Sequence, residues 1–477
     1  MKTTIARRSH PNLTLAVLVL GAVSYSLLQS LVAPAMPDIA RETGASASAI
    51  SWVLTGYLLA ASVATPILGR LGDIHGKERV LLAVLVALAA GTVVCALAPS
   101  VEVLIVGRVI QGAAGGIFPL AFAIIRDEFP REKVAGSIGL MSSLLGIGGG
   151  AGVVLAGVIV DHLSYHWLFW IPLPAILLAA VATYRYIPES PITAPGRINW
   201  AGGALLSLGL VLVLVAVSQA SDWGWGSGRT LGLLLAGLVV LGGWVRSELG
   251  SSDPLVDMRM MRIRGVWTTN VAALLVGVGL YTSFILIPQF VQEPESTGYG
   301  FGASVTAAGV FLLPSTITML AVGPAAGWIE RRFGAKASLV AGCLFAAASY
   351  ALLAVAHGDH WEVYLASALL GVGIGLSFAA LANLIVAAVR QDQTGVATGM
   401  NTVMRTVGGA VGGQVAGTML ASGVVAATGL PKETAFTAAF AMGAAALVVG
   451  ALVALLIPGR PAGGRVAEAV APEGAAA

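Results

Sequence analysis

The sequence predicts an all-α integral membrane protein that crosses the bilayer about fourteen times. Two observations predict this fold class. Hydrophobic residues make up 57% of the 477 residues and charged residues only 10%, whereas a soluble domain carries about 25% charged residues. Apolar runs long enough to span a bilayer, about 20 residues, also recur along nearly the whole chain. Lipid is therefore the expected solvent of most of the molecule.

The predicted spans follow these apolar runs, with boundaries good to within several residues. In chain order they cover residues 13–35, 49–68, 79–98, 101–125, 136–160, 167–187, 199–219, 230–247, 266–291, 304–328, 338–356, 362–388, 399–424 and 434–457. The first run follows three basic residues, and Ala33-Pro34-Ala35 is similar to the cleavage site of a signal peptide. The run is long, however, and Tyr25 and Gln29 lie in its second half. These features favour a first transmembrane helix with a polar face.

The distribution of lysine and arginine predicts the orientation. With the N-terminus in the cytoplasm, 21 of the 26 lysines and arginines fall in inner segments. The outer loops hold only Arg41, Arg229 and Lys432, and two more, Arg108 and Arg405, lie within spans. Because cytoplasmic loops are enriched in basic residues, this asymmetry predicts a multi-pass protein of the cytoplasmic membrane with both termini inside.

A weak internal repeat relates the two halves of the chain. The inner loops GRLGDIHGKER, from Gly69 to Arg79, and GWIERRFGAK, from Gly327 to Lys336, each have two glycines seven residues apart. Repeated loops at equivalent places indicate duplicated helix bundles. We expect a six-helix bundle at residues 1–190, an inserted helix pair with cytoplasmic linkers at 191–260, a second six-helix bundle at 261–460 and a disordered cytoplasmic tail at 461–477.

The first of these loops holds the candidate gating residues, which are Gly69, Asp73, Gly76 and Arg79. The glycines allow two helix ends to approach closely. The Asp73 carboxylate can accept hydrogen bonds from a helix N-terminus or pair with arginines, and either contact would hold one conformation. The alternative is that Asp73 is a solvated loop acid and that the basic residues only retain the loop in the cytoplasm.

With these motifs the sequence resembles the major facilitator superfamily. GRLGDIHGKER is similar to the family's loop between helices two and three, and LIVGRVIQGAAGG, residues 104–116, resembles its fourth-helix motif. NTVMRTVGGAVGG, residues 401–413, and SYHWLFWIPLP, residues 164–174, resemble helix thirteen and the entry to helix six of its fourteen-helix drug/proton antiporter (DHA2-like) branch. The resemblance implies two six-helix bundles that rock about a central cavity, with the inserted pair as an appended hairpin.

Two arginines lie inside predicted spans, where a charged side chain costs about 2.5–3.5 kcal/mol at the helix centre. For Arg108 the resemblance implies a role in proton relay or in ordering the contact of helices one and four. Gln111, almost one turn later, shares its face. Asn401 and Arg405, one turn apart, are a second candidate polar network. Each arginine can instead snorkel to the membrane surface.

The sequence departs from the antiporter pattern in two helices. In the fifth, GIGGGAGVVLAG has Val153 where proline would stand and Ala156 in place of a glycine. In the first, Gln29 is the strong polar group near the position of the branch's aspartate, and it cannot titrate. No Asp or Glu lies well inside any predicted span, whereas proton coupling needs a titratable group. Either a peripheral acid such as Asp38 or Asp161 couples protons, or coupling is weak or absent.

Candidates for the substrate cavity are polar or aromatic residues on helices that line the pathway of the resembled family: Tyr25, Gln29, Phe118, Gln289, Phe290 and Gln292. Alternative roles are open for each, since Phe118 can contact lipid and Gln292 can face the outer headgroups. A cavity without a buried carboxylate favours neutral, amphipathic or anionic compounds over permanent cations.

These features predict secondary active export of a drug-like or endogenous small molecule, amphipathic in character, with protons as the candidate coupling ion. The alternatives are uptake or uncoupled transport, and a membrane sensor or lipid-handling protein on the same scaffold. GDIHGKE lacks the spacing of a phosphate-binding loop, and the six histidines and two cysteines show no metal-ligand spacing. We therefore expect a monomer that is not an enzyme and has no cofactor, metal or nucleic-acid partner.

Overall fold

The computed structural model describes residues 11–147, 151–190, 192–425 and 428–458. Within these ranges the chain is helical apart from short connections and one isolated bridge between Val424 and Pro431. The predicted all-α class is confirmed. The tail predicted at 461–477 lies outside the described residues.

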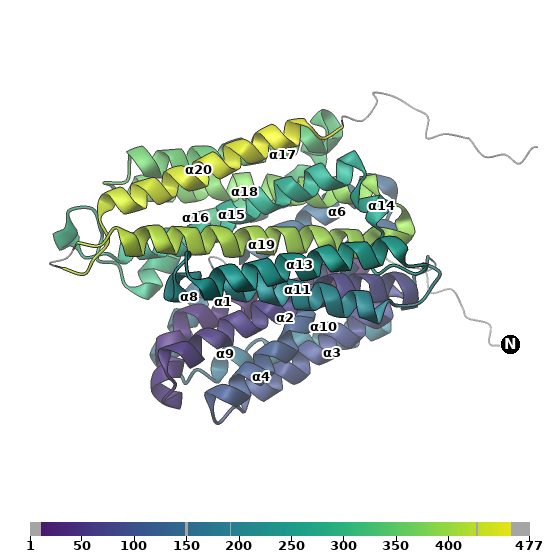
Figure 1. Cartoon of the computed structure of the whole chain (residues 1–477), viewed down its shortest axis with the longest axis horizontal. Coiled ribbons are helices and arrows are strands. Elements are labelled where there is room, and N and C mark those ends of the chain that lie inside the picture. The colour runs from purple at the N-terminus through teal and green to yellow at the C-terminus, as the bar shows by residue number, and fades with distance from the viewer. Residues whose placement is uncertain (1–10, 148–150, 191, 426–427, 459–477) are drawn as a thin grey trace, which may run out of the picture.

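The first half of the chain supplies helices that lie side by side along the long axis (Figure 1). Their bounds are α1 (Pro11–Thr43), α2 (Ala47–His75), α3 (Lys77–Ala96), α4 (Val101–Gln111), η1 (Gly112–Gly116), α5 (Ile117–Glu128), α6 (Arg131–Ser143), α7 (Leu145–Ile147), α8 (Val153–His162), α9 (Trp167–Trp170) and α10 (Leu173–Tyr186). The α4, η1 and α5 segments run on without a break, so together they form one long span, 101–128.

The second half begins with a hairpin and continues with long helices. The bounds are α11 (Trp200–Ser218), α12 (Ala220–Trp223), α13 (Gly228–Gly250), α14 (Met258–Met261), α15 (Arg264–Gln292), η3 (Glu295–Thr297), α16 (Val305–Phe333), α17 (Ala335–Val355), α18 (His360–Ala388), η4 (Gln391–Gln393), α19 (Thr394–Ser422) and α20 (Glu433–Leu455).

Twelve helical segments of the described residues are long and apolar enough to cross a membrane. Each overlaps a predicted span. The other two predicted spans, 136–160 and 399–424, correspond to the interrupted run α6–α8 and to α19, which are not among the twelve. Glycines, threonines and Arg405 lower the hydropathy of α19. Helix length and hydropathy therefore establish twelve candidate spans and not the fourteen that the sequence predicted.

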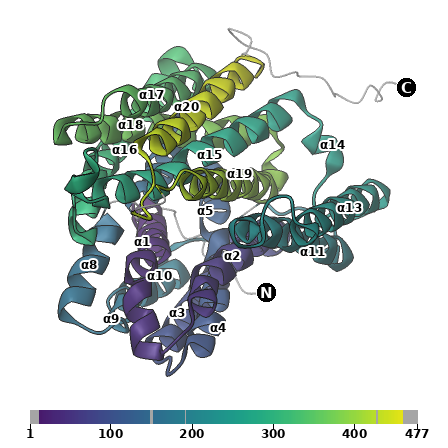
Figure 2. The ribbon, with the colours of Figure 1, turned by 60° about the vertical axis from the view of Figure 1, so that its left-hand side comes forward.

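The apolar side chains of each half pack into a core of their own. One buried cluster draws on residues 17–187 with two side chains of α18, and a second on residues 272–457. A third cluster joins the hairpin side chains Leu206 and Trp244 to Ile385 of α18 and Val396 of α19. Figure 2 shows α11 and α13 at the side of the molecule, next to α2 and α19. The hairpin thus covers the seam between the halves.

The six connections that follow α2, α5, α10, α13, α16 and α18 lie at one end of the molecule, which we call the basic end. Side-chain contacts link them: Lys77 to Ile192, Arg126 to Arg390, and Arg331 to Glu132. We call the other end the opposite end. This common placement follows from the alternating direction of successive helices.

Close helix packing at glycine is clearest between α17 and α18. A Cβ on Gly373 would lie 2.5 Å from the Ala346 nitrogen and 2.6 Å from the Gly342 carbonyl oxygen, and a Cβ on Gly342 would lie 2.7 Å from the Gly373 oxygen. Helices in membranes associate through such small residues because their backbones can then touch.

We expect Gly373→Val to destabilise the protein by about 1–3 kcal/mol, because the added side chain overpacks a backbone contact. Thermal unfolding in detergent measures this effect. The matched control is Gly358→Val, since Gly358 lies in a connection and a Cβ there meets no atom within 4 Å. Equal unfolding temperatures for the two variants would contradict the packing argument.

Candidate functional site

Asp73 joins the two halves of the molecule at the basic end. It lies in the last turn of α2 and is fully buried. Its carboxylate accepts hydrogen bonds from the backbone nitrogens of Gly395 at 3.0 Å and Val396 at 2.9 Å. Both belong to the first turn of α19, where N–H groups have no partner within the helix and the helix dipole favours an anion. The predicted contact with a helix N-terminus is therefore present.

Two glycines of the same loop shape this contact. A Cβ on Gly69 would lie 2.4 Å from the Gly395 carbonyl oxygen, so only glycine lets α2 and α19 touch here. Gly76, with a φ of +102°, ends α2 and begins α3. Arg79 does not join this contact, because its exposed side chain pairs with Glu189 on the surface of the N-terminal half. The part of Arg79 in gating therefore stays a prediction.

A buried ion pair lies directly behind Asp73. Lys77 Nζ is 2.7 Å from Asp127 Oδ2, and both side chains are fully buried. Lys77 also donates to the Ile192 carbonyl at 2.8 Å, and the Ser190 hydroxyl donates to Asp127 at 2.6 Å. Lys77 is thus no solvated retention charge. Removing one partner of such a pair leaves a buried charge, which typically costs about 3–5 kcal/mol.

The second copy of the loop repeat makes an equivalent contact between the halves. A Cβ on Gly327 would lie 2.5 Å from the Gly136 Cα, so α16 and α6 touch there as α2 and α19 do. Glu330 accepts a hydrogen bond at 2.8 Å from Asn383, whose amide also donates to the Ala135 carbonyl. Gly334, with a φ of +85°, ends α16 as Gly76 ends α2. The weak sequence repeat therefore corresponds to a structural repeat.

A further contact between the halves escaped the sequence analysis. Arg126, near the end of α5, donates to the carbonyls of Val389 at 2.9 Å and Arg390 at 3.1 Å and to the Thr394 hydroxyl at 2.6 Å. Nothing in its neighbourhood in the sequence points to partners more than 260 residues away. The sequence shows a positive charge at a helix end, which is equally typical of a residue that keeps a loop in the cytoplasm.

Arg108 is buried completely in the N-terminal half and does not snorkel. Its guanidinium donates to the Leu28 carbonyl of α1 and the Val53 carbonyl of α2, each at 3.2 Å, and to Gln111 Oε1 at 2.8 Å. It also lies 4.1 Å from the centre of the Tyr57 ring. The structure thus brings Arg108 and Gln111 together and ties the first, second and fourth spans to one side chain.

Other candidates meet in the centre, between the two halves. Tyr25 packs edge-on against Phe118, with 5.7 Å between ring centres. The Gln29 amide of α1 donates to the Tyr281 hydroxyl of α15 at 3.4 Å. Arg405 of α19 lies within electrostatic reach of the Tyr281 and Tyr25 hydroxyls. This group, which we call the central site, combines both halves.

Arg405 and Asn401 do not form the expected network. The Asn401 amide donates to Asn270 at 2.9 Å. The Arg405 guanidinium instead stacks over the Phe378 ring, 4.3 Å from its centre. Among the described residues, no ion pair includes Arg108 or Arg405.

The remaining candidates lie away from the central site. Phe290 is buried in an aromatic cluster with Tyr299, Phe301, His357, Phe436 and Phe440. Gln289 is exposed, and Gln292 donates to the Pro288 carbonyl within its own helix. Asp38 pairs with Arg41, and Asp161 is exposed. Phe290 was predicted to line the substrate cavity because it lies on α15. The other face of that helix packs inside its own bundle, and Phe290 lies on that face.

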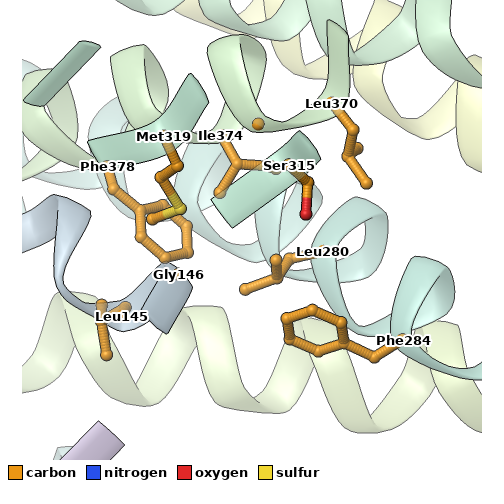
Figure 3. A pocket seen from close by; sticks show the side chains of 10 residues that line it. Leu145, Gly146, Leu280, Phe284, Ser315, Met319, Leu370, Ile374 and Phe378 are labelled. Carbon is orange, nitrogen blue, oxygen red and sulfur yellow. The ribbon is translucent and has the colours of Figure 1, made fainter. Parts of the chain in front are cut away.

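A small apolar pocket, shown in Figure 3, is lined by Phe378, the ring over which Arg405 stacks. Leu145 and Gly146 of α7 line one side. The C-terminal half supplies the other lining residues: Leu280, Phe284, Ser315, Met319, Leu370, Gly371, Ile374 and Phe378. One face of the Phe378 ring contacts the Arg405 guanidinium. Phe378 therefore connects the pocket with the central site.

We expect Asp73→Ala to loosen the basic end. The change removes two hydrogen bonds to a charged acceptor, each worth about 1.5–3 kcal/mol. In a chain whose two cysteines are replaced by alanine, a cysteine at buried Val396 should react with a maleimide at least about tenfold faster once Asp73 is replaced. Asp392→Ala is the control, because the ion pair that Asp392 makes in the described part of the chain is with Arg390 of its own connection. Equal rates of maleimide reaction in the unaltered, Asp73→Ala and Asp392→Ala proteins would contradict the idea that Asp73 holds α2 against α19.

Comparison with known proteins gives consistent matches. The model of the Major Facilitator Superfamily matches residues 18–413. Multidrug resistance protein 3 of Bacillus subtilis is 30% identical over 319 residues, 66% of this chain and 61% of that protein. The tetracenomycin C resistance and export protein of Streptomyces glaucescens is 30% identical over 399 residues, 82% of this chain and 72% of that protein.

The chain covers less than two thirds of some of these relatives. It covers 56% of an uncharacterized MFS-type transporter of Mycobacterium tuberculosis, at 28% identity over 81% of this chain. The crystal structure of the human organic anion transporter MFSD10 (TETRAN) superposes with a TM-score of 0.68 over 93% of this chain and 99% of that one, at 16% identity, so the two share a fold. With most of its length matched by the family model, this chain belongs to the Major Facilitator Superfamily, a family of secondary transporters.

Proposed function

We propose that this protein exports drug-like or endogenous small molecules by alternating access of the central site to the two sides of the membrane. One observation carries the proposal. The apolar core of each half is drawn almost entirely from its own side chains, and near the basic end the halves also meet through hydrogen bonds and glycine contacts. Such contacts can break and re-form without disturbing either core. The names of the relatives, a multidrug resistance protein and an export protein, support the direction and the type of substrate.

The chain crosses the membrane fourteen times in this proposal. Helix α19 has 29 residues, or about 44 Å at the helical rise. It starts beside Asp73 at the basic end, and Thr418 near its other end accepts a hydrogen bond from Trp225 of the hairpin turn at 2.8 Å. The run α6–α8 likewise reaches from Glu132 to Gly157, which packs against Thr306 at the start of α16. These two crossings complete the division into bundles 1–190 and 261–460 with the hairpin between them.

The basic end faces the cytoplasm in this proposal, because lysine and arginine are retained on that side. In a chain whose two cysteines are replaced, a membrane-impermeant maleimide applied to intact cells should label Gly226→Cys, in the hairpin turn, and not Ser252→Cys. Both positions are exposed. Permeabilised cells should show labelling of both. The reverse pattern in intact cells would invert the orientation, and labelling of both would contradict α13 as a crossing.

Proton coupling needs an acid that can take up and release a proton. Asp38 and Asp161 stay its candidates, although the structure places both at the opposite end and away from Arg108. In the described part of the chain the central site holds no carboxylate paired with its arginines. This observation favours uncoupled transport as the second candidate.

Transport in proteoliposomes with and without an imposed pH gradient separates these candidates. The panel holds one neutral, one anionic and one cationic aromatic compound. We expect Arg108→Ala to lower the rate at least about tenfold, because two hydrogen bonds and a cation–π contact that position α1 and α2 are lost. Arg229→Ala, an exposed residue of the opposite end, is the control.

The gradient decides the coupling. Under proton antiport, Asp38→Asn or Asp161→Asn should abolish the stimulation by the gradient while leaving transport down the substrate gradient intact. Movement that ignores the pH gradient in the unaltered protein would overturn proton coupling. No movement of any compound in the panel would count against export of drug-like compounds.

A further inference from the structure

We propose that the central site and the adjoining apolar pocket bind an aromatic organic anion, with Arg405 holding the anionic group. The inference rests on the proposed function and names its substrate class. Four features of the described residues carry it: the surroundings of Arg405, the unsatisfied donor near it, the geometry of the pocket, and the charge of the whole site.

The Arg405 guanidinium makes no hydrogen bond and no ion pair with a described residue. The residue is only partly exposed, and its one described contact is the stacking over Phe378. Its backbone packs tightly on α15, because a Cβ on Gly277 would lie 2.1 Å from the Arg405 carbonyl oxygen. One turn later, Gly409 leaves room for the Tyr281 ring. Arg405 and Tyr281 therefore lie on neighbouring turns of the interface between α19 and α15.

The N-terminal half holds a further unsatisfied donor near this place. The Nη2 atom of fully buried Arg108 makes no hydrogen bond with a described residue, and the guanidinium lies 4.1 Å from the centre of the Tyr57 ring. A buried polar group without a partner costs about 1–3 kcal/mol, more if it is charged. Tyr57 packs against Tyr25, with 6.4 Å between ring centres, and Tyr25 is in electrostatic reach of Arg405. An anion between the halves would offset part of this cost.

The pocket supplies the apolar part of the ligand site. Two of its aromatic side chains each contact one polar group of the central site. Phe378 lies under Arg405, and Phe284 packs edge-on against Tyr281 with 6.3 Å between ring centres. The remaining lining is aliphatic, including Leu280, Met319 and Ile374. These walls would supply apolar and aromatic contacts to the ring of a ligand whose anionic group pairs with Arg405.

The charge of the site selects against cations. Two guanidinium groups lie in or beside it, and the ion pairs of the described residues neutralise neither. Charges interact strongly in the low dielectric of a membrane protein. A cationic ligand would therefore be repelled, and a neutral ligand would leave the positive charge of the guanidinium groups uncompensated.

The test uses three naphthalene compounds that differ in charge and little in shape: naphthalene-2-sulfonate, naphthalene-2-sulfonamide and (2-naphthylmethyl)trimethylammonium. Calorimetry on the full chain in phosphatidylcholine nanodiscs, with empty nanodiscs subtracted, should show the sulfonate binding most tightly. Arg405→Gln should weaken the sulfonate about 10- to 100-fold, as expected for loss of a charged hydrogen bond, and leave the sulfonamide unchanged. Arg246→Gln, which removes an exposed charge of the hairpin, is the control and should change neither.

Two more variants keep the proposal falsifiable if Arg405→Gln does not fold. Tyr281→Phe should weaken only the sulfonate, by several-fold, and Ile374→Phe should weaken sulfonate and sulfonamide alike by filling the pocket. Tighter binding of the ammonium compound, or sulfonate binding that neither Arg405→Gln nor Tyr281→Phe weakens, would overturn the anion site.

The two proposals fail separately. Sulfonate binding without its movement across proteoliposomes would overturn transport and keep the site. Movement of the sulfonamide or the ammonium compound without sulfonate binding would overturn the site and keep transport.

Discussion

Arg108 carries a full charge inside a bundle that lipid surrounds, and its guanidinium can be stabilised only by groups of the protein itself. Those groups are backbone carbonyls of α1 and α2 and the Gln111 amide. Because the carbonyls belong to the helix backbones, the side chain fixes where α1 and α2 lie. That placement sets Gln29 opposite Tyr281 at the centre and brings the end of α2, with Asp73, against α19. The central site and the contact of Asp73 with α19 at the basic end therefore both depend on the position of Arg108.

The two halves are held together internally by apolar packing, whereas polar groups make many of the contacts between them near the basic end. Each half buries an apolar cluster drawn mostly from its own side chains, so a movement between the halves would leave most of that cluster covered. Near the basic end the seam includes hydrogen bonds accepted by Asp73 and donated by Arg126 and Asn383, together with glycine backbones in contact. Hydrogen bonds of this kind contribute about 1–3 kcal/mol each. A ligand shifts such an equilibrium only by its difference in affinity for the two states, and a seam of a few bonds keeps the required difference small.

Helix length and hydropathy support twelve of the predicted spans, because the apolar length of a helix is a local property. They do not support the span predicted at 399–424, because many glycines of α19 serve contact with neighbouring helices and lower its hydropathy. The nearness of Arg108 and Gln111 was predictable because residues three apart share a helix face. The partners of Asp127, Arg126 and Arg405 lie on distant helices, and no local pattern encodes them. Phe290 shows the limit most clearly, since being on a pathway helix does not decide which way a side chain faces.

An anionic substrate also bears on why the centre can lack a titratable acid. Arg405 has no carboxylate partner among the described residues, so the empty site is positive and the loaded site is closer to neutral. A charge that crosses the membrane gains or loses about 2.3 kcal/mol per 100 mV. With the inside negative, outward movement of an anion is favoured by the potential itself. Export of such a substrate then needs no exchange for protons, and the missing acid of the first helix becomes consistent with export.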